Sequence, residues 1–516
     1  MSLLKPRLSF WQIINMNVGF FGIQYSFGLQ QSAVNPIYDF LGASPDEIPW
    51  LNLAGPLTGL LVQPIIGALS DRTWYPKFGR RKPYFFIGAI MCSLALFAFP
   101  FSSSLWMAAG LLWILDAGNN TAMEPYRAFV ADKLDPSQQP TGFQAQSFFT
   151  GFGQTLANFS LLIFPLIFMG KTGKIPNWVF ASFTLGAICS ITSVWWSMKT
   201  TPEIPPSNEE IAEMKAKPLN IFSPFIDVAN AIGNMPKVMW MLALVYLFQW
   251  YALFCYWQNS SKAVAKNAYG WQSIKMSKGL DDTYNSYLSF EKAVKTYEGE
   301  FDNKFNTQSS FISSATPQIL YETYKDKITT TKFVPAQMDS VNIINNNNKN
   351  YEKAVSATGG INGWYNIVTF LVAFSLVWLA RKYSPKLVHV FCLLLAGIGF
   401  IAFSQIHQLA LFYVAITGFG VGWASMMGIP YLMIVSDIPK EKYGVYMGII
   451  NMMIVIPMFI QTITFGYIMK HFLNNDSSKA ILFAGVFLLI AAFITTFIKS
   501  KKLTPAIMAT PSTGGH

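Results

Sequence analysis

Apolar positions in this chain gather into long runs that are separated by short polar loops. Windows of about 20 predominantly apolar residues recur along it, and each is long enough to cross roughly 30 Å of hydrocarbon as a helix. We count twelve, centred near residues 21, 57, 92, 118, 156, 186, 247, 372, 396, 424, 456 and 488. This pattern predicts an all-α polytopic membrane protein with twelve transmembrane helices, six on each side of a polar middle segment.

Two polar segments divide the windows into groups. Residues 198–235 are polar and contain proline, and we expect them to form a cytoplasmic linker. Residues 259–360, between windows seven and eight, are expected to form an extracytoplasmic helical insertion. The insertion either docks a partner or is a decoration, since long surface insertions cost little free energy. The predicted organisation is an N-terminal six-helix bundle (1–197), the linker (198–235), helix 7 (236–258), the insertion (259–360), helices 8–12 (361–500) and a cytoplasmic tail (501–516).

The composition supports a membrane protein and orients it. Of the 516 residues, 52% are hydrophobic and only 12% are charged, about half the charged fraction of soluble proteins. The net charge of +11 does not indicate nucleic acid, because the basic residues gather in alternate loops, as the positive-inside rule describes. We therefore expect both termini in the cytoplasm and the lipid bilayer as the surrounding medium. The four cysteines lie inside apolar windows and are typical of small apolar residues rather than of a disulfide or metal set.

The fourth window, residues 111–132, carries three ionisable side chains, Asp116, Glu124 and Arg127. Such a side chain costs at least ~2.5–3.5 kcal/mol at mid-membrane, so three in one span point to function. At 100° per residue, Asn120 lies about 40° and Arg127 about 20° round the helix from Asp116. These three residues form one stripe roughly 16 Å long, with Glu124 at its edge. The stripe indicates a polar pathway for a solute or a proton.

A short motif suggests that the two groups of six windows are related. The pattern Pro-Tyr-x5-Asp occurs at residues 125–132 and again at 430–437, in the fourth window of each group. Parallel repeats of this kind build the major facilitator transporters, whose solute site lies between the halves near mid-membrane. The ionisable residues are not repeated, because Leu432 and Val421 occupy the positions that correspond to Arg127 and Asp116. The ion chemistry is therefore predicted to belong to the N-terminal half alone.

Several motifs resemble one transporter family. They are residues 24–36, 55–56, 63–64, 67–72, 78–83, 115–121, 125–132, 444–451 and 456–457. They are similar to the plant sucrose/proton symporters of the glycoside–pentoside–hexuronide:cation branch of the major facilitator superfamily. Residues 257–270 look like bacterial carriers linked to maltose and other α-glucosides. The resemblance covers nearly the whole chain except residues 271–360, and it implies the major facilitator fold.

Asp116 is the predicted proton or cation carrier, and the resemblance implies the same role. The alternative is a static hydrogen bond between this Asp and a neighbouring Asn. Arg127 either partners the acid or donates to sugar hydroxyls, since its five fixed donors suit bidentate contacts. Glu124, three residues before Arg127, either forms a structural ion pair with it or carries the proton itself. The plant carriers have a small residue at the position of Glu124, so their proton chemistry does not transfer directly.

Amide and aromatic side chains are the candidate sugar contacts, because amides match hydroxyls that both donate and accept. The alternative for the amides is hydrogen bonding between helices. The alternative for Trp257, near the end of a span, is an anchor at the membrane interface. The predicted substrate-binding residues are Gln24, Gln30, Asn35, Asn119, Asn120, Gln146, Trp250, Trp257, Asn366 and Asn451. A separate set, in the loop between windows two and three, resembles the cytoplasmic gate of the superfamily. It consists of Asp71, Arg72, Arg80 and Arg81.

The predicted function is import of a disaccharide, maltose or a sucrose-like glycoside, by proton symport with alternating access. A Na⁺-coupled symporter and a transporter-like sugar sensor are the alternatives. No nucleotide motif of the form GxxxxGK[ST] occurs and the four histidines are scattered, so we expect neither an ATP-driven pump nor an enzyme. The expected partners are a sugar and H⁺ or Na⁺, with no cofactor, metal or nucleic acid. The expected location is the inner membrane of a bacterium.

Overall fold

The computed structural model describes residues 7–135, 138–206, 235–274, 278–301, 315–328, 338–434 and 443–498, with a few single positions between 209 and 233. Before the linker the long helices are α1 (Phe10–Phe40), α3 (Ala54–Arg72), α4 (Lys82–Ala98), α5 (Leu105–Lys133), α6 (Gln139–Ile163) and α7 (Asn177–Thr200). After it, the long helices of the bundle are α10 (Lys237–Tyr269), α14 (Met338–Lys382), α15 (Pro385–Gln405), α16 (Leu409–Ile434), α17 (Tyr443–His471) and α18 (Ser477–Thr495). The prediction of an all-α fold with six long helices in each half is confirmed.

Short elements complete the described part of the chain. The helix α2 (Ile48–Leu51) precedes α3, and the 3₁₀ turns η1 (Phe99–Phe101) and η2 (Phe164–Leu166) follow α4 and α6. The strands β1 (Lys171–Thr172) and β2 (Ile175–Pro176) form an antiparallel hairpin. Between α10 and α14, the seventh and eighth long helices, the chain forms α11 (Lys278–Phe301) and α13 (Pro317–Tyr324).

Eight of the described helical segments are long and apolar enough to cross a membrane by length and composition alone. The long bundle helices outside this set are α1, α5, α6 and α14. These four carry many of the amide and acidic residues that the sequence singles out, and polar side chains lower the hydropathy of a span. The lower hydropathy of these four helices thus reflects the polar side chains that they carry.

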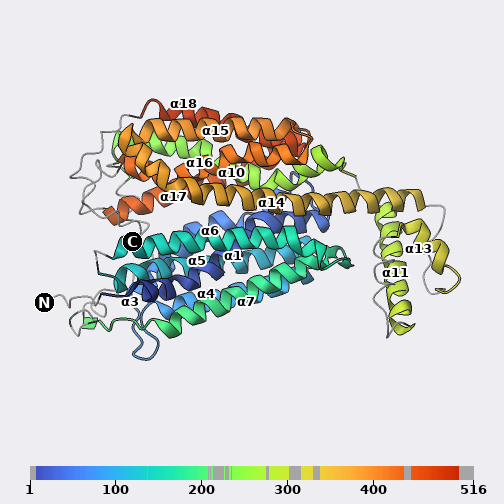
Figure 1. The fold of residues 1–516 in the computed structure, drawn as a ribbon, viewed down its shortest axis with the longest axis horizontal. Helices are drawn as coiled ribbons and strands as arrows, with labels where there is room; N and C mark the ends of the chain where they lie inside the picture. The colour runs from blue at the N-terminus through green and yellow to red at the C-terminus, as the bar shows by residue number, and fades with distance from the viewer. Residues whose placement is uncertain are drawn as a thin grey trace.

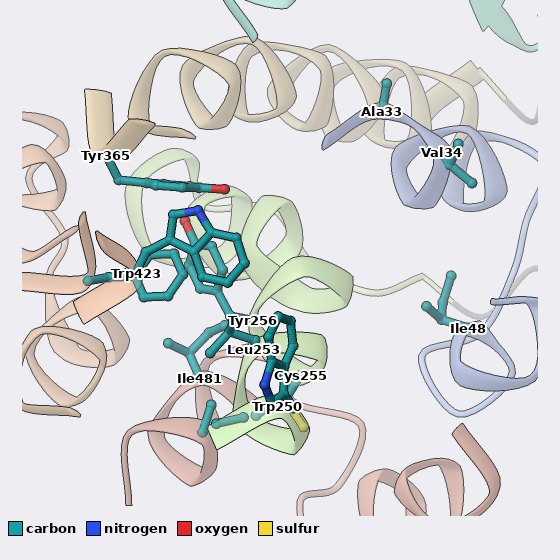
Figure 2. Close-up of a cluster of buried hydrophobic side chains, with 14 of the residues drawn as sticks. Ala33, Val34, Ile48, Trp250, Leu253, Cys255, Tyr256, Tyr365, Trp423 and Ile481 are labelled. Atoms are coloured by element: carbon teal, nitrogen blue, oxygen red, sulfur yellow. The ribbon is translucent and has the colours of Figure 1, made fainter. Parts of the chain in front are cut away.

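Each half forms its own helical bundle, and the two bundles lie side by side (Figure 1). In the N-terminal half α1 packs against α6 and α7, and α4 packs against α5. In the C-terminal half α15 packs against α16 and α10 against α18, while α14 also packs along α6 of the other half. One buried apolar cluster continues from Ala33 and Val34 of α1 to Tyr256 and Trp423 in the C-terminal half (Figure 2). Within it, Tyr256 stacks on Phe400 at 4.7 Å between ring centroids.

The helices next to the insertion are longer than the sequence predicts. Helix 7 was expected to end at residue 258, but α10 continues to Tyr269, and α14 starts at Met338 as one helix of 45 residues. The polar residues 258–262 did not end helix 7 because all five are buried by neighbouring helices. The segment between the two helices is therefore shorter than the predicted 259–360.

The insertion packs on the extended part of α14. Tyr287 of α11 lies in one buried cluster with Val341 of α14, and Phe290 of α11 packs with Leu320 of α13. Figure 1 shows α11 crossing α14 at one end of the molecule, and the helices of both bundles run from there toward the opposite end. We call these the insertion end and the terminal end.

Candidate functional site

Asp116 lies near the middle of α5 and is only 2% exposed. Gln30 of α1 donates from Nε2 to its Oδ1 at 2.6 Å. Its Oδ2 is buried and has no hydrogen-bond partner among the described residues. A Cβ added at Gly55 of α3 would lie 3.7 Å from this Oδ2, so α3 covers that side of the carboxyl. The structure thus brings together two predicted site residues, Asp116 and Gln30, which are 86 positions apart in sequence.

Asn119 and Asn120, also on α5, point to different neighbours. The amide of Asn119 donates to Ser26 Oγ at 3.1 Å and to Gln30 Oε1 at 3.4 Å. The amide of Asn120 donates to Thr58 Oγ1 at 3.0 Å, and its Oδ1 accepts from Gln63 Nε2 at 2.6 Å. Both predicted substrate residues are therefore engaged in contacts between helices, on α1 and on α3 respectively.

Arg127 and Glu124 do not complete the predicted group around Asp116. Eleven residues separate Asp116 from Arg127, about 16 Å along the helix, and among the described side chains Arg127 makes no ion pair with either acid. A Cβ at Gly67 of α3 would lie 3.8 Å from Glu124 Cγ, and Glu124 has an interaction partner of its own. The polar stripe predicted from the sequence therefore runs along α5, but Asp116 at one end does not contact Glu124 or Arg127 at the other.

The other predicted residues of α1 also contact amides. Gln24 accepts at Oε1 from Gln154 Nε2 of α6 at 2.9 Å. Asn35 accepts at Oδ1 from Asn52 at 2.6 Å and donates to the backbone carbonyl of Trp257 in α10 at 3.4 Å. Asn35 thus bridges the two halves rather than facing Asp116.

Trp250 and Trp257 of α10 both meet one ring of α16. Each lies edge-on to Trp423, with 5.7 Å between ring centroids. Figure 2 shows Trp250, Trp423 and Tyr365 on three different helices of the C-terminal half. Trp250 Nε1 is buried and has no hydrogen-bond partner among the described residues. Trp423 is an aromatic neighbour that the sequence did not single out.

Three substrate predictions remain, on α6, α14 and α17. Gln146 of α6 is buried, and its Nε2 lacks a hydrogen-bond partner in the described part of the chain. Asn366 of α14 is buried and donates to the carbonyl of Asn362 in its own helix at 2.9 Å. The side chain of Asn451 lies outside the described residues.

The predicted gate loop at the terminal end contacts the linker. The carboxylate of Glu203 accepts the backbone N–H groups of Arg80 at 2.7 Å, Arg81 at 3.0 Å and Lys82 at 2.8 Å. These N–H groups lie at and just before the start of α4, where the helix supplies no backbone acceptor, and a carboxylate there is stabilising. The side chains of Asp71 and Arg72 lie outside the described residues.

Arg81 also ties the gate loop to α5. Its Nε donates to Asp132 at 2.9 Å and one terminal nitrogen donates to Ser70 Oγ at 2.7 Å. Asp132 is the last residue of the repeated Pro-Tyr-x5-Asp motif, so in the first repeat this acid binds the gate arginine. Gly79 has a φ of +88°, and a Cβ there would lie 2.6 Å from Glu203, so only glycine fits without strain.

Polar contacts join the two halves at the insertion end. Asp39 of α1 forms a buried ion pair with Lys262 of α10 at 2.5 Å, with side-chain exposures of 7% and 5%. The hydroxyl of Tyr351 in α14 donates to the same carboxylate. We call Asp39, Lys262 and Tyr351 the ionic lock.

A second ion pair links the hairpin to α14, between Lys171 and Glu352 at 2.5 Å. Burial by itself lowers the pKa of the Lys171 ammonium, but the Glu352 carboxylate, with Tyr284 and Glu291 of α11, raises it, and the net direction is upward. The hairpin of the N-terminal half is therefore held electrostatically by both α14 and the insertion.

A chain of hydrogen bonds between uncharged side chains also joins the two halves, about two helical turns before the ionic lock along α1 and α10. Tyr256 donates to Asn362 Oδ1 at 2.8 Å, and Asn362 donates to Ser32 Oγ of α1 at 2.9 Å. Ser32 in turn donates to Asn158 Oδ1 of α6 at 2.6 Å. All four residues are buried, so each of these hydrogen bonds replaces one that water would otherwise supply.

A protein-family model described as the Major Facilitator Superfamily matches residues 16–280, slightly more than half of the chain. The chain belongs to the Major Facilitator Superfamily. Similar curated proteins include Sucrose transport protein SUC3 of Arabidopsis thaliana, 31% identical over an alignment of 191 positions; the match covers 33% of this chain and 30% of the relative. Sucrose transport protein SUT5 of Oryza sativa subsp. indica is 24% identical over an alignment of 286 positions; the match covers 48% of this chain and 51% of the relative. The chain is thus matched to about a third to a half of the length of these relatives.

Solved structures show the same fold at low sequence identity. The nucleoside transporter NupG has a TM-score of 0.60 at 13% identity, and the match covers 95% of this chain and 99% of that one. The xylose transporter XylE from E. coli has a TM-score of 0.53 at 12% identity, with coverage of 96% and 99%. The predicted major facilitator fold and the resemblance to plant sucrose carriers are confirmed, and these relatives are transporters rather than enzymes.

Sequence reasoning missed the contacts between the halves of this superfamily member. Asp39 lies just beyond window one and Lys262 just beyond window seven, in the predicted insertion. Opposite charges a few residues beyond the ends of two windows are the signal that would have suggested the ionic lock. Asn362 and Ser32 carried no such signal, because amides and hydroxyls are common in membrane helices.

Proposed function

We propose that this protein imports a disaccharide, maltose or a sucrose-like glycoside, by proton symport through alternating access. The observation that carries the proposal is the state of Asp116, a buried acid at mid-helix with one oxygen held by Gln30 and one oxygen without a partner among the described residues. A fixed structural acid would have both oxygens satisfied, because an unpartnered buried oxygen is costly. Asp116 is therefore suited to gain and lose a proton.

The surroundings of Asp116 suit a sugar at the same depth. Asn119, Asn120 and Gln30 lie beside the carboxyl, and their amides both donate and accept, so sugar hydroxyls can take the place of their present partners on neighbouring helices. The names of the plant relatives, sucrose transport proteins, support a glycoside as substrate. The aromatic group of Trp250, Trp257 and Trp423 in the other half is the candidate surface for the apolar face of a sugar ring.

Alternating access requires two gates that open in turn. The ionic lock and the Lys171–Glu352 pair close the insertion end, which we assign to the outside because basic loops mark the opposite side as cytoplasmic. The location we propose is the inner membrane of a bacterium, with both termini in the cytoplasm. In this arrangement the structure represents a state that is shut toward the outside.

The test is uptake of radiolabelled maltose and sucrose into proteoliposomes under an imposed pH gradient or an imposed Na⁺ gradient. We expect accumulation of one of the sugars above equilibrium with the pH gradient alone. Accumulation that requires Na⁺ would favour the Na⁺-coupled alternative. Absence of uptake of any glycoside under either gradient would contradict the proposal.

A further inference from the structure

The two oxygens of Asp116 differ in their surroundings, and three residues from three helices produce the difference. Cys92 of α4 donates from Sγ to Asn119 Oδ1 at 3.1 Å. Asn119 of α5 donates from Nδ2 to Gln30 Oε1 at 3.4 Å, and Gln30 of α1 donates from Nε2 to Asp116 Oδ1 at 2.6 Å. Each link donates toward the carboxyl, so the direction is uniform along the chain of contacts.

This direction matters because an amide has two ends of similar shape and opposite character. Gln30 can stabilise a carboxylate only if its N–H₂ end faces Asp116, and it would repel a carboxylate with its Oε1 end. Asn119 donates to Oε1 of Gln30 and so favours the orientation in which Nε2 of Gln30 faces Asp116. The thiol of Cys92 contacts Oδ1 of Asn119 and orients this second amide in the same way.

We infer that Asn119, supported by Cys92, is a positioning residue that holds the donor end of Gln30 on Asp116 Oδ1, so that the transported proton binds at Oδ2. This inference rests on the proposed proton symport. A proton on Oδ2 leaves the contact between α1 and α5 intact. The new O–H group lies on the side of α3, where a sugar hydroxyl entering beside Thr58 is the acceptor it lacks.

Within the described part of the chain, no charged side chain beside Asp116 competes with Gln30 in stabilising its carboxylate. The titratable side chains on other helices that Asp116 influences electrostatically are Tyr38 of α1 and Cys92 of α4, and a phenol and a thiol are ordinarily neutral at pH 7. From α3 the neighbour is Gly55, while Thr58, one turn farther along, contacts Asn120. On α5 itself, Glu124 and Arg127 are about 12 and 16 Å farther along the helix.

The test is a pH titration of the reconstituted protein, without sugar, by infrared difference spectroscopy. The C=O band of a protonated carboxyl is assigned to Asp116 by its loss in Asp116→Asn. In Gln30→Met we expect the midpoint to move to higher pH by about one unit, a roughly tenfold higher proton affinity, because the carboxylate loses its donor. Asn119→Leu is expected to shift the midpoint in the same direction by a smaller amount.

The double variant separates positioning from an independent effect. Because Asn119 acts through Gln30, adding Asn119→Leu to Gln30→Met is expected to produce no further shift. Asn119→Ser, whose hydroxyl is too short to reach Gln30, replaces Asn119→Leu if the latter does not elute as a folded monodisperse protein. The matched control is Gln63→Met, which breaks an amide contact between α3 and α5 that ends on Asn120.

An unshifted midpoint in both Asn119 variants, additive shifts in the double variant, or an equal shift in Gln63→Met would overturn the inference. So would a wild-type Asp116 that shows no protonated band across the accessible pH range. The titration needs no substrate, so a protein that carries no sugar would contradict the proposed function while this result still decides the positioning role.

Discussion

Replacing Lys262 with methionine is predicted to open the insertion end of the protein. Lys262→Met retains an apolar stem of similar length but removes the ammonium that pairs with Asp39 at 2.5 Å. Asp39 is then left as a buried carboxylate with Tyr351 as its remaining partner in the ionic lock. In an open state the same carboxylate is hydrated, so the substitution raises the free energy of the closed state alone.

The size of the effect follows from the burial of the pair. Both side chains are less than a tenth exposed, and removing one partner of a buried ion pair costs roughly 3–5 kcal/mol. Each 1.4 kcal/mol changes an equilibrium constant about tenfold, so the ratio of open to closed molecules is expected to rise by roughly a hundredfold to a few thousandfold. Asp39→Asn combined with Lys262→Met leaves no unpaired charge, and its equilibrium is expected to lie closer to that of the wild type.

The assay is electron–electron distance measurement between spin labels on the two halves. Exposed positions at the insertion end are available at Ser103, before α5, and Gln408, before α16. With labels at Ser103→Cys and Gln408→Cys and with Cys189→Ala as background, the wild type is expected to show mainly the shorter distance. Lys262→Met is expected to move most of the population to a longer distance.

A matched control is available one turn farther along α10. Lys266 pairs with Asp476 at 2.5 Å, but this pair lies within the C-terminal half and its lysine side chain is 47% exposed. Lys266→Met is therefore expected to leave the distance distribution unchanged. An unchanged distribution in Lys262→Met, or an equal change in both variants, would refute the role of the ionic lock.

Three further outcomes are expected. Glu203→Gln weakens the charge-assisted bonds to three backbone N–H groups at the start of α4, so we expect a loss of about 1–3 kcal/mol in unfolding free energy, measured by denaturation in detergent. Gly79→Ala is expected to destabilise the same loop by at least about 1 kcal/mol, because it combines a φ of +88° with a clash on Glu203; a stability equal to the wild type would be inconsistent with the described loop. Asn362→Leu removes the donor to Ser32, so we expect a faster rate of sugar exchange limited by opening of the insertion end, measured by counterflow; a rate unchanged from the wild type would show that this bond does not hold the halves together.

Much of the fold was accessible from hydropathy, because a bilayer requires about 20 apolar residues for each crossing and tolerates few exceptions. The helix ends near the insertion could not be predicted from hydropathy, because the polar residues 258–262 are buried by neighbouring helices and continue α10. Burial of polar groups depends on which helices meet, and spacing along one helix does not contain this information.

The candidate site was predictable in part for the same reason. Asp116 was found from its cost in a membrane span, and Gln30 from its amide type on α1. Helical periodicity also placed Arg127 in line with Asp116, but a shared helix face extends over many ångströms and does not imply contact. Two ion pairs, between Arg81 and Asp132 and between Asp39 and Lys262, join segments that are far apart in sequence, so only the three-dimensional structure reveals them.

Proton movement driven by sugar tests the central proposal most directly. Proteoliposomes loaded with a pH-sensitive dye and exposed to maltose or sucrose are predicted to acidify inside when they contain the wild type. Asp116→Asn is predicted to abolish this acidification, while Glu124→Gln is predicted to retain it. Acidification that survives in Asp116→Asn but is lost in Glu124→Gln would contradict the account and assign the proton to Glu124.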